Sequence, residues 1–149
     1  MPALLLMLKE MNRHFPNETG GVLLGFRSSN EDWIITRIVG PGPKAIHGRY
    51  HFIPDYEFHR NEVARIYEAS NCEETYLGDW HTHPGASAYT SERDKKTLKN
   101  IFNAKDARLE EPIMLIIGTS PFELKGWSYS KKGLPYRDFP NRKIQILFR

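Results

Sequence analysis

The chain has 149 residues, of which 40% are hydrophobic and 26% charged, and its formal net charge is +3. These values are ordinary for a globular protein, and the length predicts one domain over residues 1–149. Acidic and basic residues are interspersed, so charge gives no sign of nucleic-acid binding. The sole cysteine, Cys72, excludes an intramolecular disulfide and any zinc site built from several cysteines.

Residues 1–8 are apolar but too few to span a membrane. They also lack the basic flank and the small-residue cleavage site of a signal peptide. A single cysteine fits a reducing compartment. We therefore expect a cytoplasmic protein without a membrane partner.

The first third of the chain predicts one helix and two strands. Apolar residues at three-to-four spacing predict a helix over residues 4–15, which Pro16 ends. Residues 21–26 and 33–39 are typical of strands separated by a turn at residues 28–30, and a loop rich in Gly and Pro then reaches residue 49. The apolar stripe of the helix consists of Leu4, Leu5, Leu8, Met11 and Phe15.

The middle of the chain alternates strands and helices. Residues 50–53 are typical of a short strand, and Asp55 then caps a second helix. We expect the strand over residues 76–83 and a third helix over residues 91–102 to follow. The expected buried face of the second helix consists of Phe58, Val63, Ile66 and Tyr67.

The last third predicts mainly strands. The continuous apolar run at residues 112–119 is typical of a central strand covered on both faces. Alternation predicts a strand at residues 122–130, residues 131–143 read as a strand and loop with two prolines, and residues 144–148 close the chain as a strand. Because strands and helices intermix, we expect an α/β or α+β sandwich with one central mixed sheet.

The most informative motif is His81-Thr82-His83-Pro84, followed by Asp94. Side chains two apart on a strand share a face, so His81 and His83 can converge on one ion. Pro84 ends the strand, and Asp94 arrives in the first turn of the third helix. Two imidazoles and a carboxylate leave the fourth tetrahedral position open for water, as in a catalytic zinc site.

Two further residues are candidates for catalysis. A hydrolase of this kind needs a group that takes a proton from water, and Glu18, in Asn17-Glu18-Thr19-Gly20-Gly21, is the best candidate. Ser91 has two compatible interpretations: it caps the third helix, and its hydroxyl donates to the oxyanion of an attacked carbonyl. The helix dipole alone would also favour a carboxylate at Asp94. The other four histidines are interpreted as surface or core residues.

The order Glu18, His81-x-His83-Pro84, six residues, Ser91, two residues, Asp94 resembles the signature of the JAMM (MPN+) metalloproteases. Residues 18–25, Glu-Thr-Gly-Gly-Val-Leu-Leu-Gly, are similar to the glutamate-bearing first strand of that family, and residues 78–80, Gly-Asp-Trp, resemble its short bacterial form. The motifs lie between about residues 10 and 103, and the strands to about residue 127 fit the same order.

The resemblance implies a cytidine-deaminase-like JAB/MPN fold and a compact prokaryotic zinc isopeptidase. In that family His81, His83 and Asp94 would bind one catalytic Zn²⁺, Glu18 would act as general base and acid, and Ser91 would steady the tetrahedral intermediate. Such enzymes cut after the C-terminal glycine of ubiquitin or a ubiquitin-like protein. Partners would include that modifier or its conjugate and E1- or E2-like enzymes, in an anti-phage system for some relatives.

Three alternatives remain to be weighed. Nucleoside deaminases need zinc sites with two or three cysteines, which this chain lacks. RadC-like JAB proteins, linked to DNA repair, share the histidine spacing, but they usually carry Asn where Thr82 stands and Ser-Gly where Gly85-Ala86 stand. A non-catalytic MPN scaffold is disfavoured because all five motif positions are intact.

Overall fold

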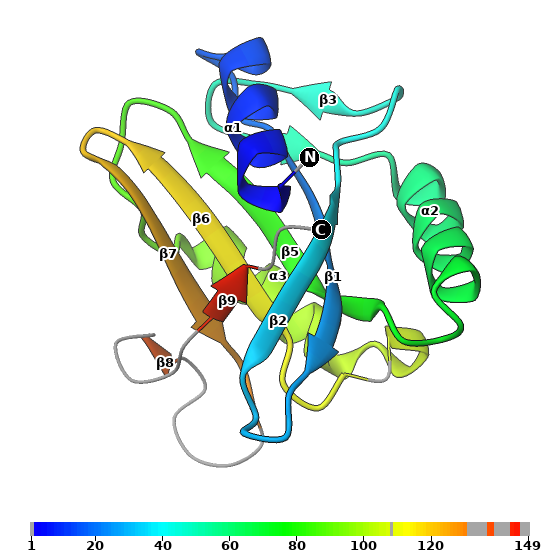
Figure 1. The fold of residues 1–149 in the computed structure, drawn as a ribbon. Helices are drawn as coiled ribbons and strands as arrows, with labels where there is room; N and C mark the ends of the chain where they lie inside the picture. The colour runs from blue at the N-terminus through cyan, green and yellow to red at the C-terminus, as the bar shows by residue number, and fades with distance from the viewer. Residues whose placement is uncertain (1, 108, 131–136, 139–143, 147–149) are drawn as a thin grey trace.

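The structure is a computed structural model that describes residues 2–107, 109–130, 137–138 and 144–146. Its elements form three layers, with one large sheet between helices (Figure 1). In chain order the elements are α1 (Ala3–His14), β1 (Gly20–Arg27), β2 (Trp33–Val39), β3 (Ile46–His47), β4 (Phe52–Ile53), α2 (Tyr56–Ala69), β5 (Thr75–His83), α3 (Glu92–Asn103), the 3₁₀ turn η1 (Lys105–Ala107), β6 (Ile113–Thr119), β7 (Phe122–Ser128), β8 (Arg137–Asp138) and β9 (Ile144–Ile146).

The large sheet has seven strands in the order β8-β7-β6-β5-β1-β2-β9. It is mixed, because β5 pairs antiparallel with β1 on one side and parallel with β6 on the other. β3 and β4 form a separate two-stranded sheet, called the β3–β4 hairpin below. The predicted fold class, one central mixed sheet flanked by helices, is confirmed.

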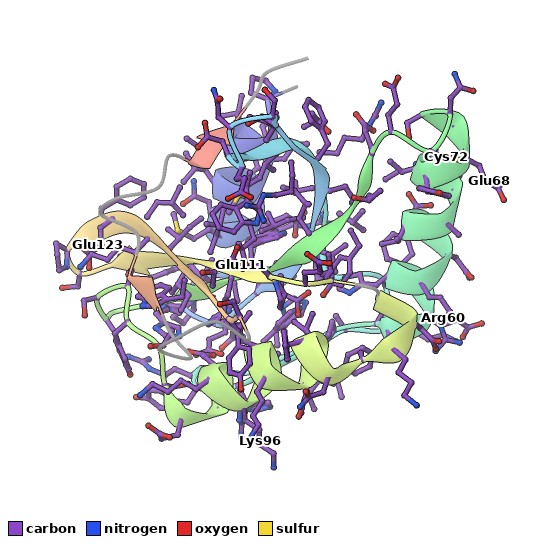
Figure 2. The ribbon with its side chains drawn as sticks, turned by 90° about the horizontal axis from the view of Figure 1, so that it is seen from below. Arg60, Glu68, Cys72, Lys96, Glu111 and Glu123 are labelled. Carbon is purple, nitrogen blue, oxygen red and sulfur yellow. The ribbon has the colours of Figure 1, made fainter. Side chains whose placement is uncertain are left out.

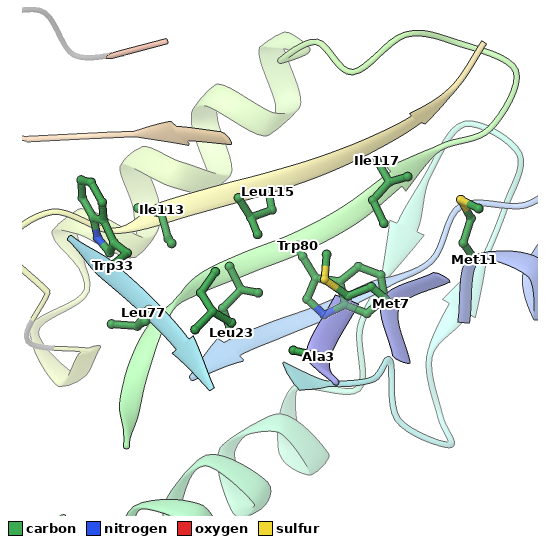
Figure 3. Close-up of a cluster of buried hydrophobic side chains, with 11 residues drawn as sticks. Ala3, Met7, Met11, Leu23, Trp33, Leu77, Trp80, Ile113, Leu115 and Ile117 are labelled. Carbon is green, nitrogen blue, oxygen red and sulfur yellow. The ribbon is translucent and has the colours of Figure 1, made fainter. Parts of the chain in front are cut away.

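The two faces of the sheet carry separate cores. On one face, α1 packs Ala3, Met7 and Met11 against a row of buried strand residues (Figure 3). On the other face α2 covers β1 and β2 through Ile66, while α3 covers β6 and β7 through Leu98. The remaining buried residues of the first core are Leu23, Trp33, Ile35, Leu77, Trp80, Ile113, Leu115 and Ile117.

Strand β6 confirms the prediction of a doubly covered central strand. Ile113, Leu115 and Ile117 belong to the core under α1, whereas Met114 and Ile116 belong to the core under α3. Such a strand buries both of its faces, so its sequence shows a continuous apolar run rather than an alternating one.

The apolar stripe predicted for the first helix is only partly correct. The residues that α1 buries are Ala3, Met7 and Met11, whereas the side chains of Leu5 and Phe15 are 44% and 58% exposed. The helix is apolar on more than one side, so three-to-four spacing alone does not select the face that meets the sheet.

Other differences concern short elements and one side chain. β3 lies inside the predicted loop, and Tyr67, expected on the buried face of α2, is 41% exposed. β4 covers only the last two residues of the strand predicted at 50–53. Of the strand predicted at 144–148, β9 covers residues 144–146, and residues 147 and 148 lie outside the described residues. In the segment 131–143 the structure describes only β8.

Within the described ranges, no helix combines the length and apolar character needed to cross a lipid bilayer. Cys72 is an exposed free thiol just after α2, at the far end of that helix from α3 in Figure 2.

Candidate metal centre

Strand β5 brings the two predicted histidine ligands together at its C-terminal end. His81 is opposite Gly20 of β1 and Ile116 of β6, so it stands on an interior strand that is held from both sides. The strand ends at His83, as the proline that follows it predicts. Both imidazoles are buried and share one face of the sheet.

The loop after Pro84 is anchored to the neighbouring strands before it enters α3. Gly85 N–H donates to Thr119 Oγ1 at 2.7 Å, and Thr119 N–H donates to Ala86 O at 2.9 Å. Ala88 N–H donates to Glu123 Oε1 at 2.9 Å. These bonds fix the path of the chain from the histidines to the start of the third helix.

Asp94 reaches the histidines from the first turn of α3. Ser91 is the N-cap of this helix, and the two residues form a capping box: Asp94 N–H donates to Ser91 Oγ at 3.1 Å, and Ser91 N–H donates to Asp94 Oδ2 at 2.9 Å. The prediction that Ser91 caps the helix is confirmed. Because Ser91 Oγ accepts this bond, its own hydroxyl hydrogen can be donated elsewhere.

The three side chains present their donor atoms to one point. His81 Nε2 lies 3.0 Å from His83 Nε2 and 3.0 Å from Asp94 Oδ1, and His83 Nε2 lies 3.3 Å from Asp94 Oδ2. Bonds of about 2.0–2.2 Å to a tetrahedral zinc ion separate the ligand atoms by about 3.3 Å. The donor set and its spacing therefore fit a zinc ion or a similar divalent cation, with three protein ligands.

The environment of Asp94 keeps its carboxylate charged. Burial disfavours the charge, but hydrogen bonds and charges of His81 and His83, together with the Ser91 N–H group, outweigh burial and hold the pKa of Asp94 well below its usual range. A ligating carboxylate must be ionised, so the site meets this condition.

Glu18 lies beside this cluster at the start of β1. Its side chain is half-buried, and its charge interacts with those of His81, His83 and Asp94. Burial raises the pKa of Glu18 above its ordinary value, with the two histidines acting in the opposite direction. A raised pKa suits a carboxylate that takes and returns a proton near neutral pH.

The glycines after Glu18 allow β1 to pass close to its neighbours. A Cβ atom on Gly20 would overlap the Trp80 carbonyl, and one on Gly21 would overlap the Val39 carbonyl. A larger residue would therefore push β1 away from β5 at Gly20 and away from β2 at Gly21, and either shift would displace the neighbouring Glu18.

Two features near the ligands were not predicted from sequence. The Tyr89 ring packs against the His83 ring with 4.9 Å between their centroids, and Tyr89 is 51% exposed, so it borders the site. His47, interpreted above as a surface or core residue, donates from Nδ1 to Glu18 O at 2.9 Å. Tyr89 is one of the six unspecified residues between Pro84 and Ser91, whereas His47 lies outside the motif and is brought to the centre by the fold.

A partly buried polar pair lies further back on β5. Tyr76 Oη donates to Asp79 Oδ1 at 2.5 Å. Burial, the largest influence, raises the pKa of Asp79 above its ordinary value, although the bond from Tyr76 and the charges of His59 and His81 oppose this. Burial likewise raises the pKa of Tyr76 well above its ordinary value. This bond gives the Tyr76 hydroxyl and one carboxylate oxygen of Asp79 a partner.

A central mixed sheet that carries two histidines, an aspartate from the next helix and a nearby half-buried glutamate defines a class of protein, the metal-dependent hydrolases. Residues 2–130 match the family described as prokaryotic homologs of the JAB domain, and the chain belongs to that family. It is a metalloprotease of the JAMM type.

Relatives of the chain carry names that agree with this assignment. A probable metalloprotease, y4qB, from Sinorhizobium fredii is 38% identical over 116 residues, which cover 77% of this chain and 71% of that protein. A protein named CD-NTase/cGAS isopeptidase from Enterobacter hormaechei is 29% identical over 148 residues, which cover 95% of this chain and 76% of the relative.

A solved structure supports the fold. The solution structure of protein DSY2949 from Desulfitobacterium hafniense superposes with a TM-score of 0.67, covering 98% of this chain and 88% of that one. At 22% sequence identity, this likeness concerns the fold alone.

Proposed function

We propose that the chain is a zinc-dependent isopeptidase that hydrolyses the bond after the C-terminal glycine of a ubiquitin-like modifier, in a conjugate or in a precursor. The observation that carries the proposal is the convergence of three buried donor atoms, all within 4.8 Å of one another, beside a half-buried glutamate. This arrangement is the one required for hydrolysis of a stable amide by an activated water molecule.

In this proposal each residue of the site has a separate role. His81, His83 and Asp94 hold the ion. When bound, zinc supplies Lewis acidity, which lowers the pKa of water and polarises a carbonyl. Glu18 accepts a proton from the attacking water and then donates it to the leaving amine. Ser91, whose hydroxyl hydrogen is not used by the capping box, donates to the developing oxyanion.

The names of relatives support the class of substrate. The Enterobacter hormaechei relative is called a CD-NTase/cGAS isopeptidase, a name that describes cleavage of a protein conjugate. We extend this to a ubiquitin-like modifier, E1- or E2-like partner enzymes and a role in anti-phage defence. We also propose that residues 1–149 act as one domain in the cytoplasm, where the exposed thiol of Cys72 would stay reduced.

The proposal is tested with a panel of ubiquitin-like proteins fused through their C-terminal glycine to a reporter amine or to a lysine side chain. We expect one or more fusions to be cut after the glycine, and cleavage to stop with a chelator and return when Zn²⁺ is added. A metal-loaded, folded protein that cuts no fusion on the panel, or one that cuts equally well in chelator, would contradict the proposal.

The rate should fall on acidification. The pKa of Glu18 is raised by burial, so this carboxylate takes up its proton at a higher pH than an ordinary glutamate and then cannot accept another. Protons also compete with a metal ion for its ligands, which acts in the same direction. We expect the rate to decline as the pH falls from neutral to mildly acidic values, measured together with bound metal. A flat rate over this range would contradict the assignment.

A further inference from the structure

The main chain of Glu18 is held by the β3–β4 hairpin. Glu18 N–H donates to Gly48 O at 2.7 Å, and Glu18 O accepts from His47 Nδ1 at 2.9 Å. Because a carbonyl oxygen only accepts, His47 must carry its hydrogen on Nδ1. Both polar groups of the Glu18 backbone are therefore bonded to two successive residues, His47 at the end of β3 and Gly48 just after it.

The orientation of the His47 ring is fixed from both sides. The His14 ring of α1 stacks on it with 3.7 Å between centroids and 11° between planes, and the Phe52 ring of β4 lies 5.4 Å away. His14 is held in turn by Glu10, whose Oε2 lies 3.3 Å from His14 Nε2. The His47 side chain thus links Glu18 to the end of α1 and to the hairpin.

On the other side, Thr82 ties the next residue to β5. Thr82 stands between the two ligand histidines, its side chain points to the opposite face of the strand, and it is 0% exposed. Its Oγ1 accepts from Thr19 N–H at 3.0 Å, and its own N–H donates to Thr19 O at 2.9 Å. The residue after Glu18 is therefore bonded twice to the residue between the ligands.

We propose that His47 and Thr82 are positioning residues, which hold Glu18 at a fixed place relative to His81, His83 and Asp94 and thereby set the rate of the hydrolytic step. This inference rests on the proposed function, in which Glu18 is the general base. A base must lie within hydrogen-bond reach of the proton it takes, and a misplacement of about 1 Å can cost about a hundredfold in rate. Glu18 precedes β1, and the pairing of β1 with β5 begins only at Gly20. The bonds from His47, Gly48 and Thr82 therefore hold the chain at residues 18 and 19, where the strand pairing does not reach.

The test of Thr82 uses Thr82→Val, which keeps the shape of the side chain and removes its hydroxyl. The Thr19 N–H then loses its partner inside the core. We expect kcat to fall at least about tenfold with little change in KM, while bound zinc stays at the wild-type ratio, because the ligand rings lie on the other face. Thr82→Ser keeps the hydroxyl and should restore kcat.

A matched control is Thr36→Val on β2. Thr36 is also buried, at 6% exposure, and within the described residues its Oγ1 has no hydrogen-bond partner. Thr36→Val therefore replaces a buried threonine hydroxyl by a methyl group, as Thr82→Val does, but breaks no hydrogen bond to the main chain next to Glu18. Its kcat should equal that of the wild type, and a loss as large as that in Thr82→Val would overturn the inference.

The test of His47 uses His47→Phe and His47→Asn. Phenylalanine keeps a ring against His14 and Phe52 but has no donor for Glu18 O, whereas the asparagine amide places an N–H group close to the position of Nδ1. We expect kcat to fall in His47→Phe and to recover in part in His47→Asn. Equal kcat values in these two variants would overturn the role of His47. Denaturant unfolding of every variant shows whether each keeps its folded state.

A double-mutant cycle separates this inference from the proposed function. If Thr82 acts through Glu18, adding Thr82→Val to Glu18→Ala should change the residual rate little, although Thr82→Val alone is harmful. Additive losses would overturn the positioning role and leave the proposed function intact. If instead the wild type cuts no modifier, or Glu18→Ala is as active as the wild type, the proposed function fails, and the inference fails with it.

Discussion

Replacing Glu18 by alanine is expected to leave zinc bound and to remove nearly all hydrolysis. Glu18 is not among the three residues whose donor atoms converge, so the ion should keep its ligands. What is lost is the group that moves protons between water and the leaving amine, a contribution of about 10²–10⁴-fold in rate. The measurement is the cleavage rate of a modifier fusion together with zinc content per chain.

The matched control for this variant is Glu68→Ala. Glu68 is an exposed glutamate on α2, and its side chain points away from the molecule in Figure 2. The same loss of one negative charge far from the site should leave both rate and zinc content unchanged. Full activity in Glu18→Ala would show that another group acts as the base.

Replacing His83 by alanine is expected to remove both the ion and the activity. His83 supplies one of three donor atoms, and a site left with His81 and Asp94 alone falls short of the three protein ligands of a catalytic zinc centre. We expect zinc content near zero after dialysis and a cleavage rate at background. These are measured by metal analysis and by cleavage of the same fusion.

The control for this variant is reconstitution. Wild-type protein stripped with a chelator should regain its rate when Zn²⁺ is returned, whereas His83→Ala treated in the same way should not. Circular dichroism of the stripped proteins shows whether the variant keeps its fold. A His83→Ala protein that binds one zinc ion per chain as tightly as the wild type would refute the assigned ligand set.

The parts of the site that sequence predicts well are those set by neighbouring residues. The shared face of His81 and His83 follows from strand alternation, and the position of Asp94 follows from the helix start at Ser91. Strand β2 was predicted with its observed bounds, since its β-branched residues lie between clear turn signals. In these cases the interactions that determine the local structure join residues only a few positions apart in the sequence.

The parts that sequence misses depend on distant contacts. A strand as short as β3 leaves too few positions for alternation to be seen. The bond from His47 to Glu18 joins residues 29 positions apart, and that from Thr19 to Thr82 joins residues 63 apart. The pairing of β1 with β5 brings Thr19 to Thr82, and the position of the separate β3–β4 hairpin beside the start of β1 brings His47 to Glu18. One sequence contains no direct record of either arrangement.

The capping box at the start of α3 has a consequence for how the ion is received. The carboxylate of Asp94 is bonded to the Ser91 backbone through Oδ2, the same oxygen that faces His83. The helix start thus holds the side chain in one rotamer whether or not a cation is present. A ligand that is ordered in advance loses little conformational entropy when it binds. The capping box therefore orders one of the three donors before an ion arrives, and this part of the centre is preorganised.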